Sequence, residues 1–221
     1  MSCWEIRIAT LIGAIVVGLT PPTTTAAEQP GLAIATLETL PVKGRAPKTG
    51  YSRDQFGQAW ADVNRNGCDT RNDILKRDLT AIIYKAGTRN CVVLSGTLLD
   101  RYSGESINFI RGNITSMEVQ IDHVVALSNA WQTGAFKLTA DQRKALANDP
   151  MNLFAVKGRL NSQKGDGDAA TWLPPLKSFR CAYVAQQIAV KAKYSLWVVP
   201  PEKAAMLTIL AKCPTQKVPL S

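Results

Sequence analysis

The sequence predicts an α+β fold in which a few short strands are embedded in a mostly helical, disulfide-containing domain. Segments with apolar residues at helical spacing alternate with short apolar runs rich in valine and isoleucine. The chain has five cysteines, and only one of them, Cys3, lies in an N-terminal segment typical of secretory signals. An even number of cysteines in the remainder of an exported chain is typical of a disulfide framework.

The first 27 residues have the pattern of a signal peptide. Arg7 precedes the apolar run Ile8 to Leu19, and small residues up to Ala27 follow it. The run is shorter than the ~20 residues that cross a bilayer, so we expect cleavage after Ala26 or Ala27 rather than an uncleaved anchor. We therefore predict a secreted protein, extracellular or in the cell envelope, without membrane contact beyond the signal peptide.

The remainder of the chain fits one domain, since domains commonly contain ~100 to 200 residues. Residues 28–50 are small, polar and proline-bearing and predict a flexible tether. We expect the domain to span residues 51–213, a C-terminal tail to span 214–221, and the protein to be a monomer. The formal net charge of +9 favours a polyanionic partner. Nucleic acid and anions of the cell wall or membrane both meet this description.

Helices are predicted from apolar spacing and capping patterns. In residues 51–63, Ser52 and Gln55 form a capping-box pattern, and Phe56, Trp60 and Val63 share one helical face. A second helix follows the turn at Asn66 and Gly67 and carries Ile74, Leu75 and Leu79. Three more helices are predicted at 139–149, with Thr139 and Gln142 as a capping box, at 179–196, and at 200–213, with Pro201 near its start.

Strands are predicted from short apolar runs. The segment "NCVVLSGTLLDRYSGESINFI", residues 90–110, contains two extended runs joined by a Ser/Gly turn and predicts a hairpin. Strands are also expected in "MEVQIDHVV" (117–125) and "MNLFAV" (151–156), and the polar segment after 156 has room for one or two helical turns.

The four cysteines that remain, Cys68, Cys91, Cys181 and Cys213, lack any CxxC pair, so a structural zinc site fits poorly. Of the three possible pairings we favour Cys68 with Cys91 and Cys181 with Cys213, because each closes a loop within one half of the chain. Each bridge would contribute ~3 kcal/mol on a loop-entropy estimate.

His123 is the only histidine, and it lies between apolar residues directly after Asp122. A histidine has an ordinary pKa near 6.5 and can act as a general base at neutral pH, although a lone histidine in an apolar strand is more often structural. Neighbouring strand residues point to opposite faces, so Asp122 and His123 could act together only where the strand ends or bulges. Asn152 and Asn161 follow. Carboxylate and amide oxygens are ligands suited to Mg²⁺ or Mn²⁺.

The runs "IDHVVALS" and "DPMNLFAVKGRLNSQKGD" resemble the ββα-metal motif of HNH nucleases, and their order is similar to that in the HNH domains of CRISPR effectors. The wider sequence, including "GCDTRNDILKRDL" and "WLPP", resembles exported HNH proteins related to the C-terminal nuclease domain of GmrSD restriction enzymes. This resemblance covers roughly residues 51–213 and predicts a ββα-metal motif within the helical domain.

The resemblance implies a role for each motif residue. His123 would be the general base, Asp122 and Asn161 would hold the divalent metal, and Asn152 would brace the loop of the motif. Asn161 stands where many members have a third histidine. The site then has few nitrogen ligands, which favours Mg²⁺ or Mn²⁺ over Zn²⁺.

Other candidates are weaker. Lys164 could contact the scissile phosphate or be solvated, and Arg71 with Asp73 could lie beside the site, although Asp69 as a helix cap explains the acidic residues equally well. The "DGD" at 166–168 lacks the rest of a calcium loop.

The tryptophans of the mature chain are interpreted as core or lid residues rather than as a base-stacking platform; they are Trp60, Trp131, Trp172 and Trp197. Phosphate contacts are expected from basic residues among Arg53, Arg71, Arg77, Lys157, Arg159 and Lys164.

The predicted function is that of a secreted metal-dependent endonuclease that cuts DNA with little sequence specificity, and RNA is left open as a second candidate substrate. The alternative is a non-catalytic secreted module that binds nucleic acid or envelope polyanions. Retention of Asp122, His123 and Asn161 together favours the enzyme.

Overall fold

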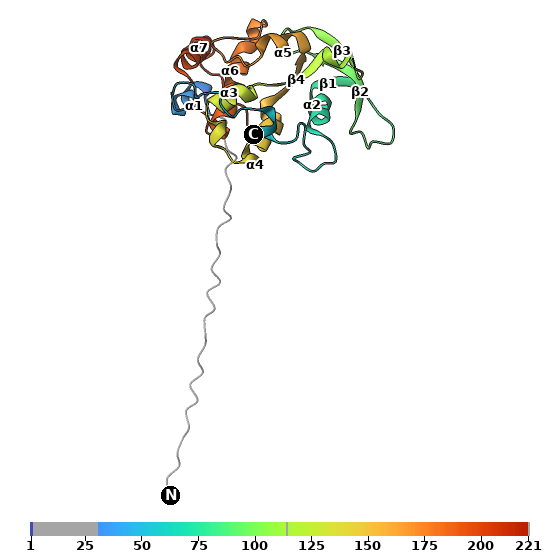
Figure 1. Cartoon of the computed structure of the whole chain (residues 1–221), viewed down its shortest axis with the longest axis horizontal. Coiled ribbons are helices and arrows are strands. Elements are labelled where there is room, and N and C mark those ends of the chain that lie inside the picture. Colours follow the sequence, from blue (N-terminus) through green and yellow to red (C-terminus); the bar gives the residue numbers. More distant parts are fainter. Residues whose placement is uncertain (2–30, 114, 221) are drawn as a thin grey trace.

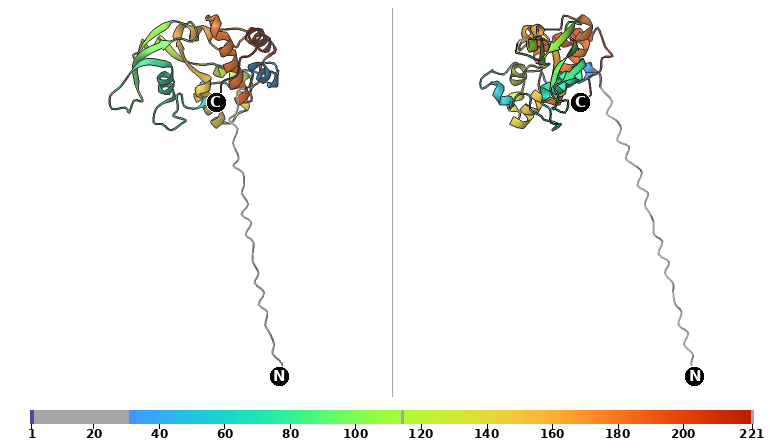
Figure 2. Two further views of the ribbon diagram at one scale, coloured as in Figure 1. Left: turned by 180° about the vertical axis from the view of Figure 1, so that it is seen from behind. Right: turned by 90° about the vertical axis from the view of Figure 1, so that its right-hand side faces the viewer.

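The computed structural model describes residues 1, 31–113 and 115–220, so nearly all of the expected signal peptide lies outside the described residues. The α+β class is confirmed, since helices surround two small antiparallel sheets. The first sheet and helix α2 lie at one end of the molecule, and helices α1, α6 and α7 lie at the other (Figure 1). Figure 2 shows the same division from behind.

The first sheet contains β1 (Leu79–Tyr84), β2 (Val93–Leu99) and β3 (Ser106–Ile110) in that order. β2 and β3 form the predicted hairpin. β1 was not predicted, because Leu79 was assigned to the preceding helix. That helix, α2 (Thr70–Asp78), ends one residue earlier, and its apolar residues pack under the sheet.

The second sheet pairs β4 (Val119–His123) with β5 (Leu153–Lys157), and helix α5 (Gly158–Lys164) follows directly. This is the strand, strand and short helix order that the resemblance implied. Gly158 makes the junction possible, since a Cβ at this position would lie 1.9 Å from the carbonyl oxygen of Met117. Helix α5 can therefore begin immediately at the end of β5.

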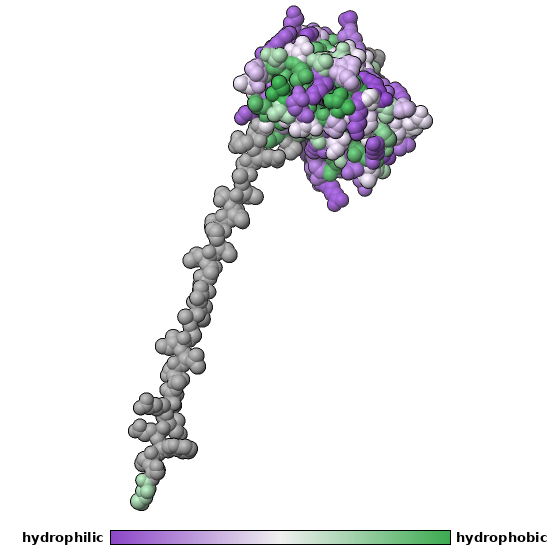
Figure 3. Space-filling model, turned by 90° about the vertical axis from the view of Figure 1, so that its left-hand side faces the viewer, coloured by the Kyte–Doolittle hydropathy of each residue, from purple (hydrophilic) through white to green (hydrophobic). Residues whose placement is uncertain are grey.

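The helical body contains α1 (Ala33–Thr39), α6 (Arg180–Lys193) and α7 (Pro200–Leu210), which enclose a core with Leu37, Val184, Ile188 and Met206. Hydrophobic side chains gather in patches between hydrophilic ones on the face at this end of the molecule (Figure 3). Helices α3 (Leu127–Gln132) and α4 (Ala140–Asn148) contribute Ala130 and Leu146 to a core that also contains Val190 of α6, and the predicted capping box of α4 is present. Short 3-10 turns lie at Arg53–Phe56, Thr115–Met117, Ala135–Lys137, Pro150–Asn152 and Lys177–Phe179.

The predicted helix at 51–63 is wrong. Only the 3-10 turn Arg53–Phe56 forms, and Ser52 makes no side-chain cap hydrogen bond. Gly57 (φ 75°) and Trp60 (φ 57°) have left-handed backbones that interrupt a helix. Phe56 is buried whereas Val63 is exposed, so the apolar spacing did not mark one common face.

The predicted flexible tether is wrong for the described residues 31–50. Helix α1 packs on α6 and α7 because Ala33, Leu37 and Leu40 form a buried apolar stripe. The expected tail is also attached, since Ala33 N donates to Gln216 O at 2.8 Å. The folded body therefore extends beyond the expected boundaries at residues 51 and 213.

Both disulfides have the favoured pairing. Cys68–Cys91 joins the loop before α2 to the β1–β2 connection, and Cys181–Cys213 joins the start of α6 to the residues after α7. In the part of the chain that the structure describes, the helices are all too short or too polar to cross a membrane.

Candidate functional site

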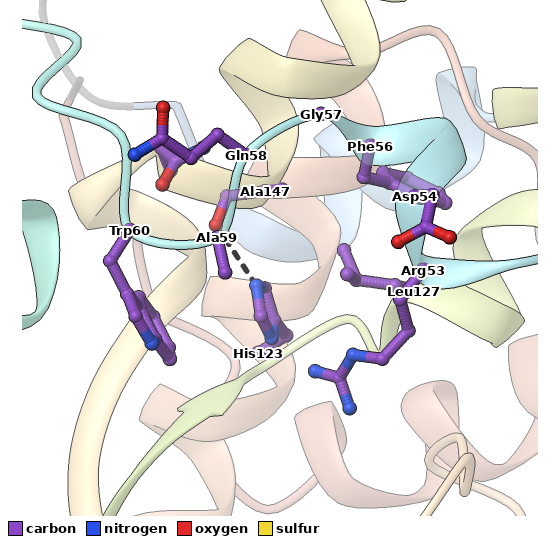
Figure 4. Close-up of a pocket in the computed structure, with 11 residues that line it drawn as sticks. Arg53, Asp54, Phe56, Gly57, Gln58, Ala59, Trp60, His123, Leu127 and Ala147 are labelled. Atoms are coloured by element: carbon purple, nitrogen blue, oxygen red, sulfur yellow. Dashed lines mark hydrogen bonds between the residues drawn. The ribbon is translucent and has the colours of Figure 1, made fainter.

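Two cavities meet at His123. The first, here called the polar cavity, has a volume of about 200 Å³ and is lined by Asp122, His123, Asn161 and Asp166, among others. The second, here called the Trp60 cavity, has a volume of about 180 Å³ and contains more apolar lining. Figure 4 shows its residues, with the Arg53 side chain beside the His123 ring. His123 and Arg53 line both cavities.

The end of β4 explains how Asp122 and His123 can face one cavity. His123 is the last residue of the strand, and the chain then turns around Asn152. The amide nitrogens of Val124 and Val125 each donate at 2.8 Å, to Asn152 O and Asn152 Oδ1 respectively. Asn152 is fully buried and its Nδ2 donates to Val125 O and Leu146 O at 3.3 Å. Asn152 thus contacts the backbone of the loop through both polar atoms of its side chain.

The hydrogen bond of His123 determines which nitrogen can accept a proton. Nε2 lies 2.9 Å from the carbonyl oxygen of Ala147. A carbonyl oxygen only accepts, so Nε2 must carry the hydrogen and Nδ1 is left as the acceptor of the neutral ring. Burial lowers the pKa of His123 to about 4. The ring of Trp60 lies nearly parallel to that of His123, with 6.0 Å between centroids.

This pKa predicts an unusual pH profile. If neutral His123 is required for turnover, kcat/KM should be retained at about pH 5.5, where an ordinary histidine would be mostly protonated. It should fall as the pH approaches 4. Stability also decreases as the pH falls below about 6.5, because the unfolded chain binds the proton before the folded chain does. Rates of plasmid cleavage, with circular dichroism at each pH, would check this. An acidic limb centred near pH 6.5 would contradict it.

Asp122 is buried between two donors. The hydroxyl of Tyr102 donates to Oδ2 at 2.5 Å, and Nζ of Lys164 donates to Oδ1 at 2.9 Å. The same ammonium donates to His123 O at 2.8 Å. Burial raises the pKa of Asp122, whereas Lys164 and the hydrogen bond from Tyr102 oppose this rise. These donors fix the carboxylate in one orientation while leaving it on the wall of the polar cavity.

Asn161 lines the same cavity. Its Nδ2 donates to Gln120 Oε1 at 2.9 Å, and among the described residues its Oδ1 accepts no hydrogen bond. Asn161, Asp122 and Asp166 line the polar cavity together. Within the described part of the chain, no group of three His, Cys, Asp or Glu side chains gathers as a metal site. A carboxylate and an amide oxygen are donors of the kind that hard ions such as Mg²⁺ accept, whereas Zn²⁺ prefers nitrogen and sulfur ligands.

The structure separates the remaining predicted residues from these cavities. Lys164 is buried behind Asp122 and lines neither cavity. Arg71 lies over the ring of Phe109, 5.8 Å from its centroid, and Arg159 is exposed on α5. Arg77 pairs with Asp78, and Lys157 pairs with Glu105. Only Arg53 among the proposed phosphate-binding residues borders His123.

Two residues of the site were missed or undervalued by sequence reasoning. Tyr102 lies in the β2–β3 connection, far from Asp122 in sequence, and nothing in its local pattern indicates the contact. Asp166 was considered only as part of "DGD", although it follows α5 directly and so could have been placed near Asn161.

Comparison with known proteins identifies the family of the chain. Residues 69–209 match the family described as GmrSD restriction endonucleases, C-terminal domain. The chain is 36% identical over 208 residues to an uncharacterized secreted protein of Arthroderma benhamiae, covering 92% of this chain and 97% of that protein. No solved structure matches.

The secreted relative and the two disulfides agree with the predicted export of the chain. The family match covers most of the chain, including Asp122, His123, Asn152 and Asn161, and the chain therefore belongs to the family of GmrSD C-terminal, HNH-like nuclease domains.

Proposed function

We propose that the protein is a secreted, metal-dependent endonuclease that hydrolyses phosphodiester bonds in DNA with little sequence specificity, with RNA as a further candidate substrate. One observation carries the proposal. The Asp122 carboxylate, the Asn161 amide and His123 line one polar cavity at the end of a ββα motif. Families of this type typically use a divalent metal ion, so the chemistry expected is metal-assisted hydrolysis of a phosphodiester.

Asp122 and Asn161 would hold Mg²⁺ or Mn²⁺, which neutralises charge on phosphate oxygens when bound. The contribution of the chain is to hold these two oxygens in place. Tyr102 and Lys164 orient Asp122, and Gln120 orients the amide of Asn161. Lys164 therefore acts as a positioning residue rather than as a phosphate contact, because its ammonium is buried against Asp122 and the backbone.

His123 would act as the general base. Its Nδ1 takes a proton from the attacking water, while the hydrogen bond from Nε2 to Ala147 O holds the ring in place. Asn152 positions the loop after β4 and so fixes where the ring lies. As the family resemblance implies, the products would carry 5′-phosphate and 3′-hydroxyl ends.

Arg53 would bind a phosphate oxygen beside the base. Its side chain is exposed, borders both cavities and forms no ion pair within the described residues. The exposed Arg159 would add a contact to the nucleic-acid backbone. Such contacts give affinity that depends on salt and hardly on sequence.

A plasmid assay separates this proposal from a non-catalytic binding module. Supercoiled plasmid should be nicked in the presence of Mg²⁺ or Mn²⁺, and EDTA should abolish nicking until metal is restored. Retarded but intact plasmid under all metal conditions would support the binding module instead.

The metal assignment predicts different outcomes for two substitutions at Asn161. Asn161→Ala should lose activity with every metal, because one of two protein ligands is removed. Asn161→His adds an imidazole, which favours Co²⁺, Ni²⁺ or Zn²⁺ relative to Mg²⁺. The measurement is the nicking rate of each variant with a panel of divalent ions. If Asn161→Ala keeps the rates and metal preference of the unmodified protein, Asn161 is not a ligand.

A further inference from the structure

The segment between the Arg53–Phe56 turn and α2 has the spacing of a calcium-binding loop. Residues 62–73 read DVNRNGCDTRND. Oxygen-bearing side chains occupy position 1 (Asp62), position 3 (Asn64), position 5 (Asn66) and position 12 (Asp73) of this segment. Glycine occupies position 6 (Gly67). This is the ligand pattern of the twelve-residue calcium loop, with Asp in place of Glu at its last position. Most of the segment precedes residues 69–209, which match the nuclease family.

The structure brings the first and last parts of this segment together. Nδ2 of Asn66 lies 3.0 and 3.1 Å from the two carboxylate oxygens of Asp73, and Nδ2 of Asn64 lies 3.4 Å from one of them. Asp73 reaches this place because α2 begins at Thr70 and carries it in the first helical turn. Asp73 therefore lies opposite the side chains of positions 3 and 5, as the twelfth residue of a calcium loop does.

The backbone of residues 62–68 folds around its own side chains. Asp62 accepts from Asn66 N at 3.1 Å through Oδ1 and from Gly67 N at 2.9 Å through Oδ2. Gly67 has φ 87°, the left-handed turn for which calcium loops use glycine at position 6. Position 7, whose carbonyl is a ligand in such loops, is Cys68, and its disulfide to Cys91 ties the loop to the sheet.

Neither acidic side chain at the ends of the loop is neutralised by an ion pair in the part of the chain that the structure describes. Within the described residues, neither Asp62 nor Asp73 forms an ion pair with lysine or arginine. The partners of the Asp73 carboxylate are neutral amides, although the chain carries a net charge of +9. Two carboxylates and two amides at loop spacing form a set of hard oxygen donors.

We propose that residues 62–73 form a second cation site, separate from the polar cavity, that binds Ca²⁺. Asp62, Asn64, Asn66, Asp73 and the carbonyl of Cys68 supply the protein ligands, and water completes the shell. With only two charged ligands, the affinity belongs to the weak class of extracellular modules, with a dissociation constant on the order of 10⁻⁴ to 10⁻³ M. Such an affinity suits a protein that works outside the cell.

The site would also support the catalytic region. The amide nitrogen of Thr70, within the loop, donates to Trp60 O at 3.2 Å, and its hydroxyl donates to Ala61 O at 2.5 Å. Trp60 in turn lies alongside His123. Calcium binding should therefore stabilise the folded protein, by mass action, and order the wall of the Trp60 cavity.

Thermal unfolding of the metal-free protein with and without millimolar CaCl₂ tests the proposal. Calcium should raise the Tm of the unmodified protein by several degrees. The isosteric variants Asp62→Asn and Asp73→Asn should lose this rise, whereas Asp141→Asn, which removes the same charge from an exposed position on α4, should keep it. Asp122→Asn should also keep it, which separates the loop from the catalytic metal. An equal calcium-dependent rise in Asp73→Asn, or no rise in the unmodified protein, would overturn the proposal.

Terbium luminescence provides a second test that does not depend on the variants folding. Tb³⁺ bound to the loop of the unmodified protein should be sensitised by Trp60, which lies two residues before Asp62, and Ca²⁺ should displace it at millimolar concentration. The absence of sensitised emission, or emission that Ca²⁺ does not reduce, would contradict a calcium loop. Neither result depends on nuclease activity, so the proposed function and this site can fail separately.

Discussion

His123→Ala is expected to lower the rate of plasmid nicking by ~10² or more, as loss of a general base typically does. The neutral ring is buried at the polar cavity, and Nδ1 is the ring nitrogen left to accept a proton. Plasmid affinity should remain nearly unchanged, because the proposed phosphate contacts come from Arg53 and Arg159. The measurements are initial nicking rates and binding in EDTA.

A matched control is needed because His123 is also part of the packing around Trp60. Trp60→Phe preserves an aromatic ring beside His123 and should retain most of the activity. Near-ultraviolet circular dichroism would establish that the variants keep the fold. Equal nicking rates in His123→Ala and the unmodified protein would exclude His123 as the base.

Lys164→Met is expected to destabilise the fold by about 3 to 5 kcal/mol, the usual effect of breaking a buried ion pair. Both partners are buried, with the Lys164 side chain inaccessible and that of Asp122 exposed by only 4%. Removal of the ammonium leaves Asp122 charged and short of one partner. Because burial already raises the pKa of Asp122, the loss of stability caused by Lys164→Met should become smaller at low pH, where the carboxyl is protonated.

The double variant Lys164→Met with Asp122→Asn provides the control. A neutral amide at position 122 needs no counter-charge, so the double variant should regain part of the lost stability while remaining inactive. Urea unfolding of the three proteins would give the free energies. If Lys164→Met unfolds at the same urea concentration as the unmodified protein, the buried ion pair does not stabilise the fold.

Local patterns in the sequence predicted those elements whose ends are set by local chemistry. Thr139 and Gln142 form the capping box expected for α4, and Asp69 caps α2 through the amide nitrogen of Asn72. The hairpin and the ββα order were also predicted correctly. In each case the residues that determine the element are neighbours in the chain.

Predictions failed where distant contacts decide the structure. Residues 31–50 looked like a tether because their apolar stripe is short and becomes stable only against α6 and α7. The expected helix at 51–63 gave way to a loop in which Trp60 adopts a left-handed backbone beside His123. An isolated sequence pattern contains no information about these packing partners.

The candidate site shows the same limit. The motif identified His123, Asp122, Asn152 and Asn161, and all four lie around the end of β4 and the start of α5. The partners of Asp122 could not be predicted, because Tyr102 reaches it from the β2–β3 connection through a tertiary contact. The burial of Lys164 against Asp122 could not be predicted either, because the local sequence around Lys164 is polar and typical of a turn.

Cleavage of a defined DNA duplex in ¹⁸O-labelled water tests directly whether a water activated by His123 attacks the phosphodiester. With Mg²⁺ or Mn²⁺, the unmodified protein should yield 3′-hydroxyl ends and 5′-phosphates that contain one ¹⁸O atom, detected by mass spectrometry. His123→Ala should yield little of either product over the same period. Products with 3′-phosphate ends, 5′-phosphates without the label, or equal product from His123→Ala would contradict hydrolysis by a water that His123 activates.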